Sequence, residues 1–487
     1  MPTARQFVRS AFSFLVGQGL SWLGSALLVV LLPRYLGDAN LGRLGFALAI
    51  SSFASFGANL GISVHLTKEI ARAPERAPQL VGLGLATRLP LSLLSVALTV
   101  AFVNVAHYDQ TTRALVYVLC GWVLVDSVRA VAQGALQGLH RMGPLAAFPA
   151  VTNTLYAVAA AVLLLGGAGP LPVAVAYLAG QAVAVILTLG VLFRNLRPRL
   201  SSSGAEWWWL VAGGLPYFVW QASLLVYGQV DIILLSLMTN DAVVGWYFAA
   251  YRFIGIPAFV PIILTTVAFP ALTAARGSPA FGRIARRALD ANLLLTIPMS
   301  LGVILISDRL IDLLHYPASF HNSVLPIVLL AAGFPMVAAD MILGTLLNTL
   351  DRQRQWAMVG VAAAVFNPLA NLLAIPMTQD HFGNGAIGAA AITTATEILV
   401  MAAGLRILPR GVFDSSTLSQ LARCLAAAGV MMAVVLPLRS FLIVVPILAG
   451  SAAYGLAALG FRAVSISDLA QVLRFVASRR RSAEPVG

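Results

Sequence analysis

Apolar runs of about twenty residues recur along the whole chain, and this is the length that crosses a bilayer as one helix. The sequence is 59% hydrophobic and only 10% charged, with a mean hydropathy of +0.88. One soluble core cannot bury so much apolar surface, so lipid must cover much of it. The pattern therefore predicts an all-α, polytopic membrane protein and excludes a soluble fold.

The runs predict about fourteen membrane spans, with boundaries good to about four residues. The first run, Ser10 to Leu32, follows Arg5 and Arg9. It is longer than a signal-peptide core and lacks a small-residue cleavage site, so we expect it to remain as a helix. Further spans are expected at 41–64, 80–106, 113–138, 146–166, 171–193, 207–236, 242–268, 286–306, 326–347, 357–377, 385–406, 422–441 and 443–462.

Most of the 31 basic residues fall in alternate gaps between these runs. Because cytoplasmic loops are enriched in lysine and arginine, the alternation places those gaps and both termini in the cytoplasm. An odd number of spans would break the alternation, so fourteen, or twelve if one pair is misassigned, is favoured. The cytoplasmic gaps contain Lys68, Arg72, Arg76, Arg141, Arg194, Arg197, Arg199, Arg276, Arg283, Arg286, Arg287, Arg352, Arg354, Arg406, Arg410 and Arg423.

Charge and cysteine content argue against two kinds of binding site. The net charge is +13, but the basic residues are spread over the loops of one side instead of forming a patch with interleaved aromatics. We therefore expect contact with anionic membrane lipids and no nucleic acid. Cys120 and Cys424 lie in apolar segments and are too few for a disulfide framework or a thiolate metal site. No metal or cofactor is expected.

The chain contains an internal repeat. Residues Gly37 to Gly42 resemble Asn240 to Gly245 about 203 residues later, and Leu136 to Arg141 resemble Leu347 to Arg352 at a similar offset. Chance similarity between apolar segments is the alternative. Two six-span halves follow, and because six is even they enter the membrane with the same polarity, as parallel repeats. Two such bundles would enclose a cleft that can open to either side.

This repeat sets the expected domain boundaries. The N-terminal lobe is predicted at 1–200, the C-terminal lobe at 201–412 and two further helices at 413–462. The tail at 463–487 carries apolar residues at helical spacing beside basic residues, which suggests an amphipathic helix on the cytoplasmic membrane surface. A disordered basic tail is the alternative.

Several segments resemble a known family. Arg34 to Gly37 and Thr67 to Arg72 in the first half, and Asp231 to Leu235 and Phe269 to Leu272 in the second, are similar to the bacterial polysaccharide-biosynthesis flippases. These Wzx-type oligosaccharide flippases belong to the multidrug/oligosaccharidyl-lipid/polysaccharide (MOP) exporter superfamily. The resemblance implies two six-helix lobes, as in the MATE transporters, followed by two C-terminal helices.

The resemblance also implies a function. Such a protein moves undecaprenyl-diphosphate-linked oligosaccharide across the bacterial cytoplasmic membrane by alternating access, for O-antigen, exopolysaccharide or another surface glycan. A polysaccharide polymerase and glycosyltransferases are the implied protein partners. The chain has no large external loop and no phosphate-cradling Gly-Lys-Thr loop, so an enzyme or an ATP motor is not expected. A lipid II flippase and a cation-coupled multidrug exporter of the same superfamily remain the alternatives.

Three arginines are expected at depth in the membrane. Arg88, Arg129 and Arg252 lie roughly 12–15 Å from the nearer surface by helical rise. An arginine there is costly unless it faces a wet cavity or a partner, and its planar fork suits phosphate. We predict that the three bind the diphosphate of the cargo, with Arg88 and Arg252 first. An ion pair with Asp126 is the alternative for Arg129, and extension to the interface is the alternative for Arg88.

Four carboxylates are also expected at depth: Asp126, Asp231, Asp340 and Glu397. A protonatable carboxylate in a span can couple transport to a proton or sodium gradient. Pairing with an arginine is the alternative role. Glu397, in the alanine-rich stretch Ala389 to Leu399, is the first coupling candidate.

Prolines inside the predicted spans are expected to bend the helices of a moving transporter. Pro216, Pro257, Pro261, Pro298 and Pro368 all lie in such positions. Each removes a backbone N–H and frees a carbonyl. Irregular packing is the alternative explanation for most of them.

Overall fold

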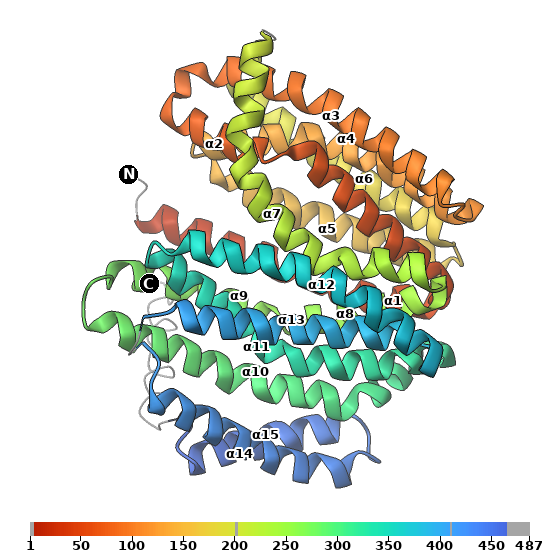
Figure 1. Ribbon diagram of the computed structural model, residues 1–487, viewed down its shortest axis with the longest axis vertical. Helices are drawn as coiled ribbons and strands as arrows, with labels where there is room; N and C mark the ends of the chain where they lie inside the picture. Colours follow the sequence, from red (N-terminus) through yellow and green to blue (C-terminus); the bar gives the residue numbers. More distant parts are fainter. Residues whose placement is uncertain (1–3, 200–202, 410–411, 465–487) are drawn as a thin grey trace, which may run out of the picture. The chain divides into compact units, whose positions relative to one another are not determined.

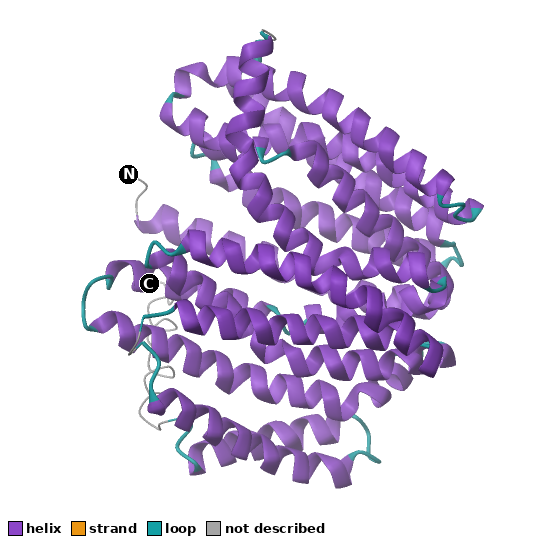
Figure 2. Cartoon of the chain, viewed as in Figure 1, coloured by secondary structure: helices purple, strands orange, loops and turns teal. Residues whose placement is uncertain are grey.

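The computed structural model describes residues 4–199, 203–409 and 412–464, and every regular element in these ranges is a helix (Figure 1 and Figure 2). Two short 3-10 helices, η1 (Pro74–Arg76) and η2 (Ala318–Ser323), lie in connecting segments. The α-helices are α1 (Ala4–Asn59), α2 (Ile62–Arg72), α3 (Ala77–Val105), α4 (Gln110–Gly138), α5 (Met142–Leu165), α6 (Pro170–Asn195), α7 (Gly204–Met238), α8 (Asp241–Gly255), α9 (Phe259–Ala274), α10 (Ala280–Leu313), α11 (Val324–Thr349), α12 (Gln353–Phe382), α13 (Gly385–Ile407), α14 (Ser415–Leu438) and α15 (Val444–Gly460).

Eleven helices in the described ranges are long and apolar enough to cross a bilayer, or twelve if the bent pair α8 and α9 counts as one span. The all-α, multi-pass membrane architecture is therefore confirmed. Two places account for the difference from the fourteen spans expected. The spans predicted at 10–32 and 41–64 form the single 56-residue helix α1, and the last predicted span is α15, which has only 17 residues.

Helix α1 is interrupted once, at Gly37, whose φ of 73° and ψ of 176° are not helical. Glycine reaches this conformation at low cost because it has no Cβ. The equivalent repeat position is Asn240, which follows α7 and caps α8 by accepting a hydrogen bond from the Val243 backbone N–H. Both copies of the repeat therefore begin a new helical segment at the same place. The two spans expected within α1 meet at Gly37.

The predicted proline positions differ in their effect. Pro257 lies between the end of α8 and the start of α9, so the span predicted at 242–268 is broken there. Pro261 falls in the first turn of α9, where a missing N–H costs no helical hydrogen bond. Pro216, Pro298 and Pro368 lie inside α7, α10 and α12, which continue through them. These three prolines do not end a helix.

The described residues form parts of two compact units, each built from separate segments. Unit 1 comprises Met1–Ile256, Leu314–Pro326 and Gly360–Ile392, and unit 2 comprises Pro257–Leu313, Ile327–Val359 and Thr393–Gly487. This division follows compactness, whereas the lobes expected at 1–200 and 201–412 are defined by sequence repetition and stay a prediction. Most of the expected amphipathic tail, from residue 465 onward, lies outside the described residues.

In unit 1, α1 packs along α4, α5 and α8, and α4 packs along α3 and α6 (Figure 1). Helices in lipid gain little from the hydrophobic effect when they associate, so close van der Waals contact carries more of the stability. Gly61 and Gly214 show such a contact between the start of α2 and α7. A Cβ on Gly61 would lie 2.1 Å from the Gly214 carbonyl oxygen, so a larger residue does not fit.

In unit 2, α14 and α15 pack against each other and against α10 (Figure 1). Ile297 of α10, Met431 of α14 and Ala458 of α15 belong to one buried apolar cluster. Tyr454 of α15 donates a hydrogen bond to the Leu294 carbonyl of α10 at 2.8 Å. The last two helices are therefore fixed to unit 2 by packing and by a polar contact.

Candidate functional site

Arg129 of α4 forms the ion pair that its spacing predicts. Its Nε donates to Asp126 Oδ1 at 3.0 Å, and its Nη2 contacts the same oxygen. Its Nη1 donates to Gln133 Oε1 at 3.2 Å, while Ser55 of α1 donates to the other Asp126 oxygen at 2.5 Å. A buried carboxylate is tolerated when it is paired and hydrogen-bonded in this way. Arg129 and Asp126 therefore form a neutral pair inside unit 1.

Arg88 of α3 is the most deeply buried of the three arginines, with 1% of its surface exposed. Its Nη1 donates to Ser63 Oγ of α2 at 3.0 Å, whereas its buried Nε has no hydrogen-bond partner in the described ranges. It lies within electrostatic reach of Asp126 and Arg129. This burial places Arg88 among protein side chains, and its extension to the membrane interface stays an alternative prediction. The burial also closes the guanidinium off from a cargo in the conformation seen.

Arg252 of α8 is only partly buried. Its guanidinium carbon lies 4.6 Å from the centre of the Phe248 ring, one helical turn earlier, which is a cation–π geometry. The phenol groups of Tyr156 in α5 and Tyr316 before η2 lie within electrostatic reach. No ion pair joins Arg252 to an acidic side chain of the described residues. Of the three arginines, Arg252 is therefore the one whose positive charge is least compensated by nearby acids.

Asp231 of α7 is 2% exposed and accepts hydrogen bonds from two neutral groups. Tyr247 of α8 donates its hydroxyl at 2.7 Å and Asn371 of α12 donates its Nδ2 at 2.8 Å. The same Nδ2 lies 3.0 Å from Asn367 Oδ1. The Tyr247 hydroxyl thus binds Asp231, while Arg252 lies five positions later on the same helix α8. Positions five apart lie about 140° around a helix from each other, so the two side chains leave α8 on different faces.

Unit 2 holds the other two predicted carboxylates. Asp340 of α11 and Glu397 of α13 are 7% and 3% exposed and lie within electrostatic reach of each other, and neither carboxyl oxygen of Asp340 has a hydrogen-bond partner in the described ranges. Two buried carboxylates this close repel each other when both are ionised, so a proton on one of them stabilises the pair. The structure thus pairs the predicted coupling residue with a second acid.

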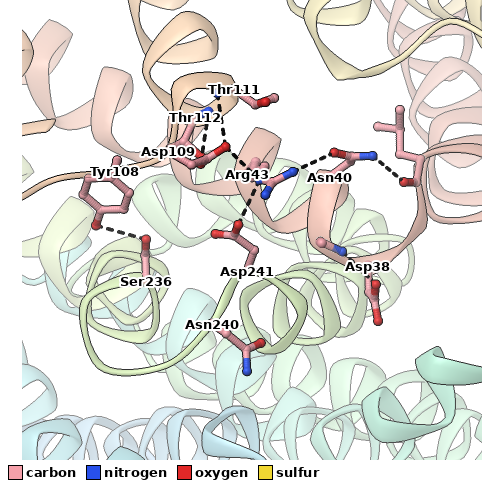
Figure 3. A network of polar contacts seen from close by, with 12 residues as sticks. Asp38, Asn40, Arg43, Tyr108, Asp109, Thr111, Thr112, Ser236, Asn240 and Asp241 are labelled. Atoms are coloured by element: carbon pink, nitrogen blue, oxygen red, sulfur yellow. Dashed lines mark hydrogen bonds and ion pairs between the residues drawn. The ribbon is translucent and has the colours of Figure 1, made fainter. Parts of the chain in front are cut away.

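A polar network joins α1, the connection between α3 and α4, and the start of α8 (Figure 3). Arg43 Nε donates to Asp241 Oδ2 at 2.8 Å and lies 3.5 Å from Asp109. Asp109 also caps α4 by accepting hydrogen bonds from the backbone N–H groups of Thr111 and Thr112. Burial raises the pKa of Asp109, but the Thr112 hydrogen bonds and the Arg43 charge outweigh it and hold this pKa below its ordinary value. Asp109 therefore stays ionised beside Arg43.

The two copies of the internal repeat touch each other in this region of unit 1. A Cβ on Gly42 would lie 1.8 Å from the Asp241 carbonyl oxygen, and a Cβ on Gly245 would lie 2.0 Å from the Asp38 carbonyl oxygen. Gly42 and Gly245 are equivalent repeat positions, as are Asp38 and Asp241. Each copy therefore presents the same glycine to the same carbonyl of the other. Reciprocal contacts of this kind are those of a two-fold interface.

The side chains follow the same reciprocity. Arg43 of one copy donates to Asp241 of the other, and Trp246, which is equivalent to Arg43, donates its Nε1 to Asp38 Oδ2 at 3.1 Å. Chance similarity between apolar segments would not place equivalent positions in equivalent contacts. The structure thus supports a true repeat whose two copies meet at α1 and α8.

The functional region also contains polar residues that sequence reasoning did not select. Ser55 and Ser63 bind the charges of Asp126 and Arg88, and Asn371 binds Asp231. Each of the three is an uncharged polar side chain that is distant in sequence from its charged partner. The only signal available beforehand was their position in or beside apolar runs.

Comparison with known proteins identifies the family. Residues 7–275, more than half of the chain, match the family model described as polysaccharide biosynthesis protein. The chain belongs to this family. A comparison with curated proteins gives no match. The family agrees with the resemblance noted in the sequence, and it supports a transporter linked to polysaccharide biosynthesis rather than an enzyme.

Solved structures establish the fold of this family member. A lipid II flippase MurJ in an inward closed conformation is 14% identical, with a TM-score of 0.77 over 93% of this chain and 99% of that chain. An inward-facing multidrug resistance MATE family transporter of the MOP superfamily has a TM-score of 0.62 at 14% identity, over 80% and 94%. The MATE multidrug transporter DinF-BH has a TM-score of 0.55 at 18% identity, over 82% and 95%. At such identities the likeness confirms the expected fold alone.

Proposed function

We propose that this protein is a flippase that moves undecaprenyl-diphosphate-linked oligosaccharide across the bacterial cytoplasmic membrane by alternating access. The family links the chain to polysaccharide biosynthesis, and the fold is that of transporters of the MOP superfamily. The observation that carries the proposal is Arg252. It is a positive charge in a membrane-spanning helix that is stabilised by aromatic rings and not by an acid.

A diphosphate is the part of this cargo that is most costly to move through about 30 Å of hydrocarbon. Fixed positive charge along the path lowers that cost, and a guanidinium matches phosphate oxygens with two parallel N–H donors. Arg252 retains this capacity because Phe248 occupies the face of its guanidinium, while the N–H groups point along the guanidinium plane. Arg129 is engaged by Asp126, and Arg88 is buried. Direct contact of either with the diphosphate requires rearrangement and stays a prediction.

The proposed orientation places both termini in the cytoplasm, as the distribution of arginines predicts. In this orientation the Arg43 network, which lies just after the Gly37 kink of α1 and at the start of α8, is on the outer side, away from the basic cytoplasmic loops. Proposed partners are anionic membrane lipids, a polysaccharide polymerase and the glycosyltransferases that build the cargo.

The proposal is tested in vesicles that contain the purified protein and a fluorescent undecaprenyl-diphosphate oligosaccharide. Transport makes the labelled glycan accessible to a membrane-impermeant reagent on the far side. We expect Arg252→Gln to slow transport by about 10- to 100-fold, since it removes one charge-assisted contact of about 1.5–3 kcal/mol. Arg197→Gln, in an exposed loop, is the matched control and should transport normally. Equal rates for Arg252→Gln and the wild type would exclude Arg252 from the path.

The same vesicles distinguish the alternative cargoes. Lipid II carries the same diphosphate but a peptide-bearing sugar, so its transport in place of the oligosaccharide would favour a lipid II flippase. A multidrug exporter would move cationic dyes, which the positive charge of Arg252 should repel. Transport of such a dye, with no movement of either lipid, would refute the proposal.

We also infer that cation coupling, if present, uses the Asp340–Glu397 pair. The two acids lie within electrostatic reach of each other inside unit 2, whereas Asp126 is paired with Arg129 and Asp231 accepts hydrogen bonds from neutral donors. An acid pair can release its proton or take up a cation when its surroundings change, and this is the property that coupling requires. The coupling ion would be a proton, with sodium as the alternative.

A further inference from the structure

A partly open cavity of about 230 Å³ lies in unit 1 between α4, α5 and α6. The residues that determine its chemistry are Trp122, Arg129 and Gln133 of α4, Asn153 of α5, and Tyr177 and Gln181 of α6. These residues supply two rings, three amides and one guanidinium. Such a lining is unusual for a space between membrane-spanning helices, because burying polar groups there costs free energy and is seldom found without a function. Apolar side chains would fill the same space without this cost.

The polar groups of the cavity can serve a neutral ligand that is rich in hydroxyls. Each amide side chain offers both donors and acceptors, which matches a hydroxyl that can act as either. Trp122 Nε1 is buried and has no hydrogen-bond partner in the described part of the chain. A buried donor without a partner costs about 1–3 kcal/mol, which a ligand oxygen would recover.

The charge of the cavity argues against a phosphate within it. Arg129 is the cation of the lining, and Asp126 and Gln133 already occupy its N–H groups. The pair is neutral, so it offers directed hydrogen bonds without the net positive charge that a diphosphate needs. A neutral sugar fits this arrangement better.

The aromatic side chains give the cavity flat apolar surfaces. The rings of Trp122 and Tyr177 are 5.7 Å apart and meet edge to face. Tyr177 in turn meets Tyr156 edge to face at 5.2 Å. Rings with a polar tip provide apolar contact and a hydrogen bond from one side chain. A sugar, with carbon-bound hydrogens on its faces and hydroxyls at its rim, uses both.

The cavity is also placed next to the proposed phosphate contact. Tyr156, whose ring touches Tyr177 of the lining, lies within electrostatic reach of Arg252. In a lipid-linked oligosaccharide the first sugar is bonded directly to the diphosphate. At about 230 Å³ the cavity is smaller than the roughly 300–1,000 Å³ typical of pockets for drug-sized ligands, so it suits one sugar rather than a chain.

We propose that the cavity between α4, α5 and α6 is a subsite for the first, diphosphate-linked sugar of the cargo. This proposal rests on the proposed flippase function and adds to it a place where sugar identity is read. Gln181 and Trp122 are the specificity-determining residues, because their polar groups face hydroxyls of the sugar ring. The rest of the glycan lies outside the cavity.

The test uses the purified protein and two kinds of lipid. One is undecaprenyl diphosphate, and the other is the same lipid bearing one sugar: glucose, galactose, N-acetylglucosamine or N-acetylgalactosamine. Binding is measured by thermophoresis in detergent. We expect the wild-type protein to bind at least one glycosylated lipid about tenfold more tightly than the bare diphosphate, as one or two added hydrogen bonds allow.

Variants separate the subsite from the phosphate contact. Gln181→Leu and Trp122→Phe should each abolish the tenfold preference and leave affinity for the bare lipid unchanged. Gln137→Leu changes an exposed glutamine one turn from Gln133 and is the matched control, which should keep the preference. Arg252→Gln should weaken both lipids by the same factor. Thermal unfolding confirms that each variant is folded.

The outcomes distinguish the two proposals. If Gln181→Leu and Trp122→Phe keep the preference, or if the wild type binds the bare and glycosylated lipids equally, the subsite is refuted while the flippase proposal stands. If the wild type binds neither lipid, both proposals fail.

Discussion

Asp126 and Asp340 are both buried aspartates in membrane-spanning helices, but the charges beside them are opposite. Asp126 lies against Arg129 and accepts a hydrogen bond from Ser55, whereas Asp340 lies within electrostatic reach of a second acid, Glu397. A carboxylate beside a guanidinium stays ionised, while two facing carboxyl groups must share a proton. The Arg129 pair is therefore suited to a fixed structural role, and the acid pair is suited to changing its charge.

The comparison indicates that buried acids have different roles in the two units. In unit 1 Asp126 and Asp231 accept hydrogen bonds from arginine, serine, tyrosine and asparagine donors, and no ion pair joins Arg252 to an acidic side chain of the described residues. In unit 2 the acid pair provides a group that can respond to pH. We infer that unit 1 handles the cargo and that unit 2 senses the driving ion.

The same substitution at the two sites gives the largest expected difference. Asp126→Asn leaves Arg129 without its counterion and should lower the free energy of unfolding by about 3–5 kcal/mol. Asp340→Asn gives Glu397 an amide donor and removes the repulsion between two acids, so its cost should stay within about 1 kcal/mol. Reversible unfolding in mixed micelles measures both. Equal losses would break the comparison.

Asp231 supplies the intermediate case, an acid held by neutral donors. Tyr247→Phe removes one of these donors without changing the ring and should cost about 1.5–3 kcal/mol, because a hydrogen bond to a charged group is lost. Tyr35→Phe removes a hydroxyl from a side chain that is 41% exposed and is the matched control, with almost no change expected. The same unfolding measurement applies. If the two variants were equally stable, Asp231 would not depend on Tyr247.

The acid pair makes a prediction about transport. Glu397→Gln should abolish acceleration by a pH gradient, a loss of about 5- to 150-fold if coupling is worth the usual 1–3 kcal/mol. Exchange of cargo without a gradient should continue, because the amide can still hydrogen-bond Asp340. The measurement is glycan accessibility in vesicles with and without an imposed gradient. A Glu397→Gln variant that still responds to the gradient would assign the coupling elsewhere.

The sequence was sufficient for features that depend on nearby residues. The apolar runs predicted the helices, and the three-residue spacing of Asp126 and Arg129 predicted their pair because both lie on one helical face. The repeat predicted a new helical segment at equivalent positions, which is observed at Gly37 and Asn240. The lengths of the spans were less predictable, since only the kink at Gly37 separates the two spans expected within α1.

Contacts between distant helices could not be predicted in this way. Asp340 and Glu397 each looked like a single acid in an apolar run, and nothing in their spacing indicates that α11 brings one to the other. The burial of Arg88 against Ser63 depends on how α2 packs on α3. Such contacts are set by the tertiary fold, which helical periodicity does not specify.

Substitutions in the Arg43 network should have the smallest effect on stability. They also test whether this network is a second pH sensor. Asp109 has a lowered pKa, so its contribution is complete above the ordinary aspartate value of about 3.9 and is lost only as pH falls through the lower native value. Between pH 5 and 8 Asp109 should therefore not change its charge. Any pH dependence of transport in this range must then arise elsewhere, with the acid pair as the first candidate.

Asp109→Asn and Asp241→Asn test this directly. Each removes a partner of a partly exposed arginine, so the loss of stability should be about 0.2–1 kcal/mol and should shrink at high salt. Asp109→Asn should not alter the transport rate profile between pH 5 and 8, whereas Glu397→Gln should flatten it. A profile that moves in Asp109→Asn would make the outer network a sensor, and the assignment of pH response to unit 2 would then be wrong.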